Sequence, residues 1–188
     1  MKVVLFNGPR TAGKDTLASA LASRMSSRHP VTILPMARPM HEAALAEYGL
    51  PPEQVDAYQP VKDEPQAELN GLTPRQVYID YGNRLRAEHG PDVLGDAWLK
   101  QAASIANHER GWLLVPDVRF QPEVNAAIRL AGKNNVMLVY VVRTGTSWEK
   151  DIGRFCEHDW SCTYINNGSL DDMGGRVERL LERAWQWY

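Results

Sequence analysis

Short apolar runs and longer stretches with helical periodicity alternate along the chain. The runs have the continuous hydrophobicity of strands buried on both faces, and the longer stretches repeat apolar residues every three or four positions. The predicted strands are residues 2–7, 31–36, 112–116, 135–142 and 163–165. The predicted helices are residues 15–28, 38–49, 121–132 and 170–186, with two more beginning at Pro74, behind the capping residue Thr73, and near Pro91. This alternation predicts an α/β fold, with a mainly parallel sheet of about five strands between two layers of helices.

Residues 51–72 interrupt the alternation. The turn-forming residues of this stretch are Pro51, Pro52, Pro60, Pro65 and Gly71. We interpret it as a mobile loop or a small lobe inside one domain spanning residues 1–188, because 188 residues is the size of a single domain.

The turn between the first strand and the first helix has the spacing of a phosphate-binding loop. It reads GPRTAGKDT from Gly8 to Thr16, a G-x-x-x-x-G-K motif. The two glycines let successive backbone N–H groups point at phosphate oxygens, and the N-terminus of the following helix attracts the same charge. Lys14 adds a mobile positive charge for the β- and γ-phosphates. The predicted ATP-binding residues of the loop are Gly8, Arg10, Thr11, Ala12, Gly13, Lys14, Asp15 and Thr16.

Two carboxylates are candidates for holding magnesium, directly or through water. Asp15 stands where the common motif has the hydroxyl that binds magnesium, although an aspartate there also simply favours the helix dipole. Asp117 follows the third apolar strand, and ligands of parallel sheets bind beyond the carboxyl ends of strands. Arg119, two residues later, can grip a second phosphate with both ends of its guanidinium group.

Further arginines are candidates for contact with the transferring phosphoryl group or the acceptor. Arg143 ends the fourth strand and is also a predicted ATP-binding residue, and Arg154 lies in the aperiodic segment 144–162, which we interpret as a lid. Arg75 and Arg84 lie on the helix after the proline-rich stretch and are candidates for the acceptor phosphate. For each arginine the alternative is a solvated surface charge. The predicted catalytic residues are Lys14, Asp15, Asp117, Arg119 and Arg154.

Composition narrows the classes of partner. The chain has 21 lysines and arginines against 23 aspartates and glutamates, a net charge of −2, which gives no global field for coating DNA or an anionic membrane. No stretch approaches the ~20 apolar residues of a membrane span. The two cysteines, Cys156 and Cys162, suit a reducing compartment, so the expected location is the cytoplasm. The terminal aromatic residues Trp185, Trp187 and Tyr188 favour core packing or a homodimer contact over ligand stacking.

With these motifs, the chain resembles the deoxynucleoside monophosphate kinases of bacteriophages, in the P-loop kinase superfamily. The matching stretches are FNGPRTAGKDTLA at 6–18, TPRQVYIDYGNRLR at 73–86, PDVLGDAWL at 91–99, DVRFQPEVNAA at 117–127 and TYINNGSLDDM at 163–173. The resemblance implies a three-layer α/β/α P-loop domain with a helical acceptor-binding lobe at 38–110 and a lid at 144–162. It also implies ATP-dependent phosphorylation of a deoxynucleoside 5′-monophosphate with Mg²⁺, in the host cytoplasm if the gene is phage-borne. The chain departs from the family at His158-Asp159-Trp160-Ser161, where the family lid tends to read His-x-Ser-Glu.

Two other functions stay open from the sequence. A kinase of the same superfamily could act on another acceptor, either a small phosphorylated metabolite or a hydroxymethylated base in DNA; phosphomevalonate kinases share the G-K-D loop. The net charge disfavours duplex DNA. Alternatively the protein could be a nucleotide-binding ATPase without an acceptor, although a third strand ending in Asp117-Val118-Arg119 suits a second phosphate better than an activated water.

Overall fold

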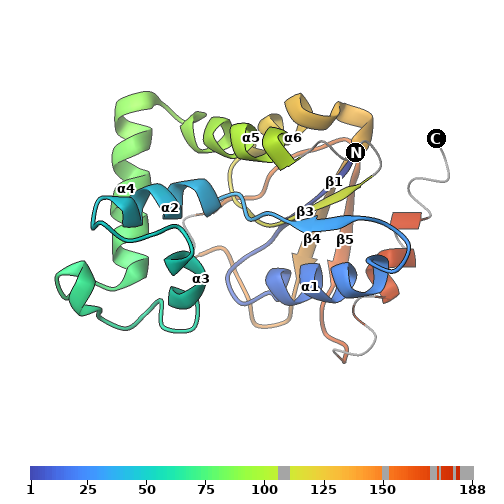
Figure 1. Cartoon of the computed structure of the whole chain (residues 1–188). Coiled ribbons are helices and arrows are strands. Elements are labelled where there is room, and N and C mark those ends of the chain that lie inside the picture. The colour runs from blue at the N-terminus through green and yellow to red at the C-terminus, as the bar shows by residue number, and fades with distance from the viewer. Residues whose placement is uncertain (106–110, 150–152, 170–172, 174, 180, 183–188) are drawn as a thin grey trace.

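A parallel sheet of five strands forms the centre of the protein (Figure 1). The computed structural model describes residues 1–105, 111–149, 153–169, 173, 175–179, 181 and 182. The strands are β1 (Lys2–Asn7), β2 (Val31–Ile33), β3 (Trp112–Val118), β4 (Val136–Val142) and β5 (Ser161–Ile165). They are arranged in the order β2-β3-β1-β4-β5, and every neighbouring pair is parallel. The predicted α/β fold is confirmed.

Helices cover both faces of the sheet (Figure 1). On one face, α1 (Lys14–Met25) and the helical residues among 173–182 pack on a cluster that includes Phe6, Leu17 and Val139. On the other face, α5 (Val93–Ile105) and α6 (Gln121–Ala131) cover a cluster around Trp98 and Leu138. Much of the predicted last helix, 170–186, lies outside the described residues.

A helical lobe lies beside the sheet (Figure 1). It contains α2 (Arg38–Ala46), α3 (Gln54–Tyr58), a 3₁₀ turn at Ala67–Leu69 and α4 (Pro74–His89). Val55, Tyr58 and Leu69 of the proline-rich stretch are buried in the apolar cluster of this lobe. Of the two interpretations, a mobile loop or a small lobe, this burial favours the small lobe. Thr73 caps α4 through a reciprocal pair of hydrogen bonds with Gln76, as predicted from Pro74 behind it.

Some strand ends differ from the prediction. β2 ends at Ile33 rather than at residue 36, since Pro35 cannot donate a hydrogen bond to the sheet. β3 continues through Val118, so Asp117 lies within the strand and not after it. A short 3₁₀ turn at Lys133–Asn135 leads from α6 into β4. Among the described residues, no helix is long and apolar enough to cross a membrane.

Candidate functional site

The phosphate loop curls tightly between β1 and α1, and both of its glycines are required for this shape. A Cβ atom on Gly8 would lie 2.4 Å from the carbonyl oxygen of Val141 in the neighbouring strand. Gly13 has a φ of +92°, and a Cβ atom there would lie 2.3 Å from Nδ2 of Asn166. The loop is thus pressed against the carboxyl ends of β4 and β5, where only glycine fits.

Lys14 begins α1, and its side chain turns back into the loop. Its Nζ atom donates hydrogen bonds to the carbonyl oxygens of Gly8 at 2.6 Å and Pro9 at 2.8 Å. Only 7% of the residue is exposed. The predicted lysine therefore holds its charge at the centre of the phosphate loop.

Asn166 holds the loop from the side, a role that the sequence analysis did not assign. Its Nδ2 atom donates to the carbonyl oxygen of Ala12 at 2.7 Å, and its backbone N–H donates to Val142 at 2.7 Å. The side chain is buried, and so is Ala12. The one available signal was its place in the Asn-Asn-Gly turn after the predicted fifth strand.

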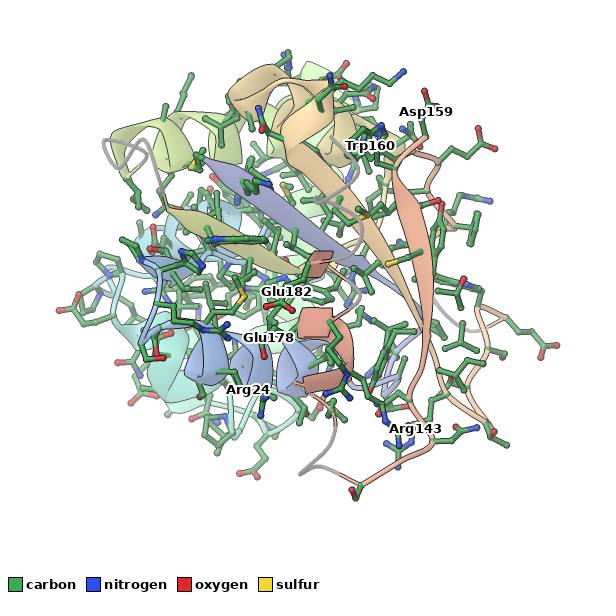
Figure 2. The ribbon with its side chains drawn as sticks, turned by 90° about the vertical axis from the view of Figure 1, so that its right-hand side faces the viewer. Arg24, Arg143, Asp159, Trp160, Glu178 and Glu182 are labelled. Carbon is green, nitrogen blue, oxygen red and sulfur yellow. The ribbon has the colours of Figure 1, made fainter. Side chains whose placement is uncertain are left out.

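A cavity opens beside this contact, next to the start of α1. Its volume is about 640 Å³, within the range of small-molecule sites. Asn167 forms part of one wall. Its Oδ1 atom accepts a hydrogen bond from the N–H of Thr144, and its Nδ2 atom donates to the Thr144 hydroxyl. Arg143 is exposed, lies at the carboxyl end of the sheet (Figure 2), and reaches Thr11 of the loop at 3.5 Å. The lining residues are Gly13, Thr16, Arg143, Thr144, Asn166, Asn167, Gly168 and Met173.

The two predicted magnesium carboxylates, Asp15 and Asp117, lie at the edge of the sheet where its strands have their carboxyl ends, which we call the mouth. Asp117 is partly buried and accepts hydrogen bonds from the backbone N–H groups of Met36, at 2.6 Å, and Ala37, at 3.0 Å. The pKa of Asp117 is raised above its ordinary value, mainly by burial and also by the nearby carboxylate of Asp15. The two backbone bonds and Arg119 oppose this rise. Asp117 thus also fixes the start of α2, which the sequence did not predict.

The donor set of this mouth fits magnesium. Asp15 is exposed, and each oxygen of Asp117 keeps a second lone pair beyond its backbone bond. Mg²⁺ is commonly held by one or two carboxylates together with substrate phosphates and water. Within the described part of the chain, no group of three or more His, Cys, Asp or Glu residues forms a metal cage. A cation here would therefore depend on the nucleotide phosphates.

Arg119 follows β3 directly and is held by its backbone. Its N–H donates to Oε2 of Glu123 at 2.7 Å, and the N–H of Phe120 donates to the same oxygen at 3.1 Å. Burial and the Asp117 carboxylate raise the pKa of Glu123 to about 7, against the backbone bonds and Arg119. Glu123 lies within the matching stretch 117–127, where no site role was predicted for it.

Arg154 lies near Arg119, although through its backbone rather than its side chain. Its N–H donates to the carbonyl oxygen of Arg119 at 2.9 Å, and its carbonyl oxygen accepts from Nδ2 of the buried Asn7 at 3.0 Å. The residue as a whole is exposed. Its predicted catalytic role stays a prediction.

The predicted lid at 144–162 is wrong for its last residues. Figure 2 shows Asp159 and Trp160 at the opposite end of the sheet from Arg143. His158 bonds to the carbonyl oxygen of Val136 at 2.8 Å, where β4 begins, and Trp160 accepts from the backbone of Leu138. The segment must cross the length of the sheet because β4 and β5 are parallel. The motif from His158 to Ser161 is thus remote from the phosphate loop. Residues 150–152 of the predicted lid lie outside the described chain. That residues 144–149 close over the site stays a prediction.

The two arginines predicted for the acceptor phosphate form ion pairs within the lobe. Arg75 pairs with Asp63, with Nη2 and Oδ2 3.0 Å apart, and Arg84 pairs with Glu47. Arg75 lowers the pKa of Asp63, and the charges of Lys62 and Arg10 lower it further, so this ion pair is within electrostatic range of a phosphate-loop residue. Arg84 is exposed on α4. Its acceptor role has no support from this geometry.

His41 marks the wall of the lobe that faces Arg119. Its ring stacks on Tyr78, with centroids 3.8 Å apart and planes 17° apart. Burial, followed by the charges of Arg119, Arg38 and Lys62, lowers the pKa of His41 to about 4. A neutral imidazole thus lies among cationic side chains from α2, the proline-rich stretch and the end of β3.

Comparison with solved structures shows the fold. A sugar kinase from a Janibacter species, solved without ligand, matches over 97% of this chain and 95% of its own, with a TM-score of 0.51 and 11% identity. An APS kinase from Mycobacterium tuberculosis matches over 96% of each chain, with a TM-score of 0.48 and 14% identity. No protein-family model and no curated protein matches the sequence. At these identities the likeness to the sugar kinase extends to the α/β fold.

Proposed function

We propose that the protein is a P-loop phosphotransferase that moves the γ-phosphoryl group of ATP to the phosphate of a deoxynucleoside 5′-monophosphate. The observation that carries this proposal is the phosphate loop with Lys14 at its centre, which follows β1, next to the end of the neighbouring strand β3, where Asp117 and Arg119 lie. One side of the mouth is built for a triphosphate, and the other presents cations for a second phosphate. The resemblance of the sequence to the phage kinases supports this acceptor class.

The donor nucleotide fits the loop and the cavity beside it. Lys14 already bonds to two carbonyl oxygens, so its Nζ atom can exchange them for phosphate oxygens without leaving the loop. In this proposal Arg143, which lines the same cavity as Asn166 and Asn167, covers the base or ribose of the nucleotide. Asp15 and Asp117, together with the phosphates, would hold Mg²⁺. The ion would neutralise part of the negative charge of the β- and γ-phosphates.

The acceptor belongs on the lobe side of the mouth. Arg119 is partly buried at the end of β3, and its charge acts on Asp117, Glu123 and His41. A phosphate oxygen of the acceptor is already anionic, so in-line attack needs orientation and charge stabilisation rather than a strong base. The neutral His41 is consistent with this, because it is not poised to take a proton near pH 7. Arg119 holds the acceptor phosphate, and Lys62 and Arg75 add positive charge at the entrance.

The test is an ADP-release assay with ATP and a panel of acceptors. The panel holds the ribo- and deoxynucleoside monophosphates, small phosphorylated metabolites and duplex DNA with hydroxymethylated bases. We expect at least one deoxynucleoside monophosphate to raise ADP release about tenfold or more above the acceptor-free rate, an ordinary size for a correctly placed acceptor. Stimulation by a metabolite or DNA alone would refute the acceptor class, and a slow ATPase without stimulation would refute the kinase.

Arg119→Ala tests the acceptor side within the same assay. The acceptor KM should rise and kcat should fall, while the KM for ATP changes little. Arg119→Lys should restore little of the lost activity, because an ammonium group cannot match two phosphate oxygens as a guanidinium group does. Arg129→Ala is the matched control, since that arginine is exposed on α6 and pairs with Asp96 of α5. Normal kinetics in Arg119→Ala would remove this residue from the site.

A further inference from the structure

The backbone of Arg119 is held from two directions at once. Glu123 accepts its N–H at 2.7 Å, and the N–H of Arg154 donates to its carbonyl oxygen at 2.9 Å. Asn7, at the end of β1, then bonds to the carbonyl oxygens of both Val118 and Arg154, at 2.9 and 3.0 Å. The residue that follows β3 is therefore fixed to α6 on one side and to the segment before β5 on the other.

Gly153 completes this enclosure. A Cβ atom at this position would lie 3.2 Å from Cβ and 3.3 Å from Cγ of Arg119, and 3.0 Å from Cζ3 of Trp148. These distances are shorter than ordinary van der Waals contacts, so a side chain here would push Arg119 aside. The glycine therefore permits the close packing of this segment on Arg119 and Trp148.

We infer that Glu123 and Gly153 are positioning residues for Arg119, and that they set the direction in which its guanidinium group enters the acceptor side of the mouth. This inference rests on the proposed function. Glu123 is 6% exposed, so its carboxylate is shielded from water and serves the two amides of Arg119 and Phe120. The bond to Phe120 is the usual one from the third residue of a helix to its cap, whereas the second bond, to Arg119, extends the contact to the residue before the cap.

The arrangement also links the segment before β5 to the acceptor arginine. Gly153 and Arg154 touch Arg119, and Phe155 stacks on Tyr140 of β4 with ring centroids 4.2 Å apart. Cys156 is buried, and the Tyr140 hydroxyl donates to its carbonyl oxygen at 2.7 Å. Any displacement of residues 153 and 154 would therefore reach Arg119 through direct contacts.

Kinetics of matched variants test the inference. Glu123→Gln keeps an acceptor oxygen for both amides, whereas Glu123→Ala removes it. We expect Glu123→Ala to raise the acceptor KM about tenfold with the ATP KM within about twofold, and Glu123→Gln to stay within about threefold of the wild type, as expected for an effect confined to acceptor binding. Gly153→Ala should show the same selective acceptor defect. The control Arg129→Ala, on the exposed surface of the same helix, should change neither KM.

Three results would overturn the inference. The first is a Glu123→Ala variant with a lower Tm and unchanged KM values, which would mark a structural role alone. The second is an equal rise of both KM values, and the third is a failure of Glu123→Gln to restore the acceptor KM.

Crystal structures of Glu123→Ala and Glu123→Gln provide a readout that needs no acceptor. The backbone of residues 119 and 120 should be displaced in the alanine variant and retained in the glutamine variant. An undisplaced Arg119 in Glu123→Ala refutes the positioning role by itself. If the wild type instead phosphorylates none of the acceptors, the proposed function fails, and the crystal structures still decide the positioning role.

Discussion

Replacing Asn166 by alanine would remove the side chain that holds the phosphate loop against the end of the sheet. The Nδ2 atom of Asn166 donates to the carbonyl oxygen of Ala12 at 2.7 Å, and both residues are buried. In Asn166→Ala that carbonyl loses this partner. The variant also opens space beside Gly13, against which the asparagine side chain packs.

The size of the effect follows from this burial. A buried polar group left without its partner costs about 1–3 kcal/mol. For a domain of this length, each kcal/mol lowers Tm by roughly 2–4 °C, so we expect a fall of about 2–12 °C. If 1–2 kcal/mol of the loss is expressed in the conformation of the loop, ATP affinity should fall by about fivefold to thirtyfold.

The neighbouring residue provides the control. Asn167 has the same side chain and makes two hydrogen bonds to Thr144, but it is exposed, so water can replace its contacts. Tm should be measured on both alanine variants by differential scanning fluorimetry, and ATP binding should be measured on Asn166→Ala by isothermal titration calorimetry, since Asn167 also lines the cavity. An equal fall in Tm in Asn166→Ala and Asn167→Ala, or an Asn166→Ala variant with wild-type Tm, would refute the assigned clamp. Asn166→Asp should not rescue, because its oxygen would face the Ala12 carbonyl oxygen.

Three further variants test the rest of the site. Lys14→Ala should lower kcat by ~10²–10³ with an intact fold, since it removes a preorganised charge from the loop centre; circular dichroism and the ADP-release assay check this. Asp117→Asn should lower Tm, because an amide N–H₂ would face the N–H of Met36 or Ala37, and should weaken the magnesium dependence of ATP binding; equal magnesium dependence in both proteins would contradict the metal role. Glu123→Gln should change how stability varies with pH. The pKa of Glu123 is raised from 4.5 to about 7, so the wild type loses stability as pH rises from about 4.5 to 7. Urea unfolding should show that the free energy of unfolding of Glu123→Gln, relative to the wild type, is about 2–3 kcal/mol higher at pH 8 than at pH 5. The same pH dependence in both proteins would contradict the shifted pKa.

The fold and the phosphate loop could be predicted from the sequence because their signals are local. Continuous apolar runs identified β1, β3 and β4, and Thr73 with Pro74 identified the start of α4. The loop motif needs backbone shape, and its two glycines encode that shape directly. Each of these features depends on residues within a few positions of one another.

The contacts that organise the site were not predictable, since they join distant residues. Asn166 holds Ala12 across 154 positions, and Asp117 fixes the start of α2 across 80. Glu123 was hidden for another reason, as its partners are backbone amides, which every residue carries. The lid prediction failed for His158 to Ser161 because an aperiodic segment does not reveal that it must cross the sheet to begin another parallel strand.

The division of the apolar core has a consequence for how the protein opens. Two clusters lie on the faces of the sheet, and the third lies within residues 37–94 of the lobe. α5 joins them, since Leu94 belongs to the lobe cluster and Trp98 to the cluster on the sheet. We therefore expect the lobe to open as a cooperative unit of its own, about its two connections to the sheet: the start of α2, which Asp117 holds, and the first turn of α5. Amide hydrogens of α4 should then exchange with solvent through partial openings that leave the sheet folded, whereas those of β1, β3 and β4 should exchange through global unfolding.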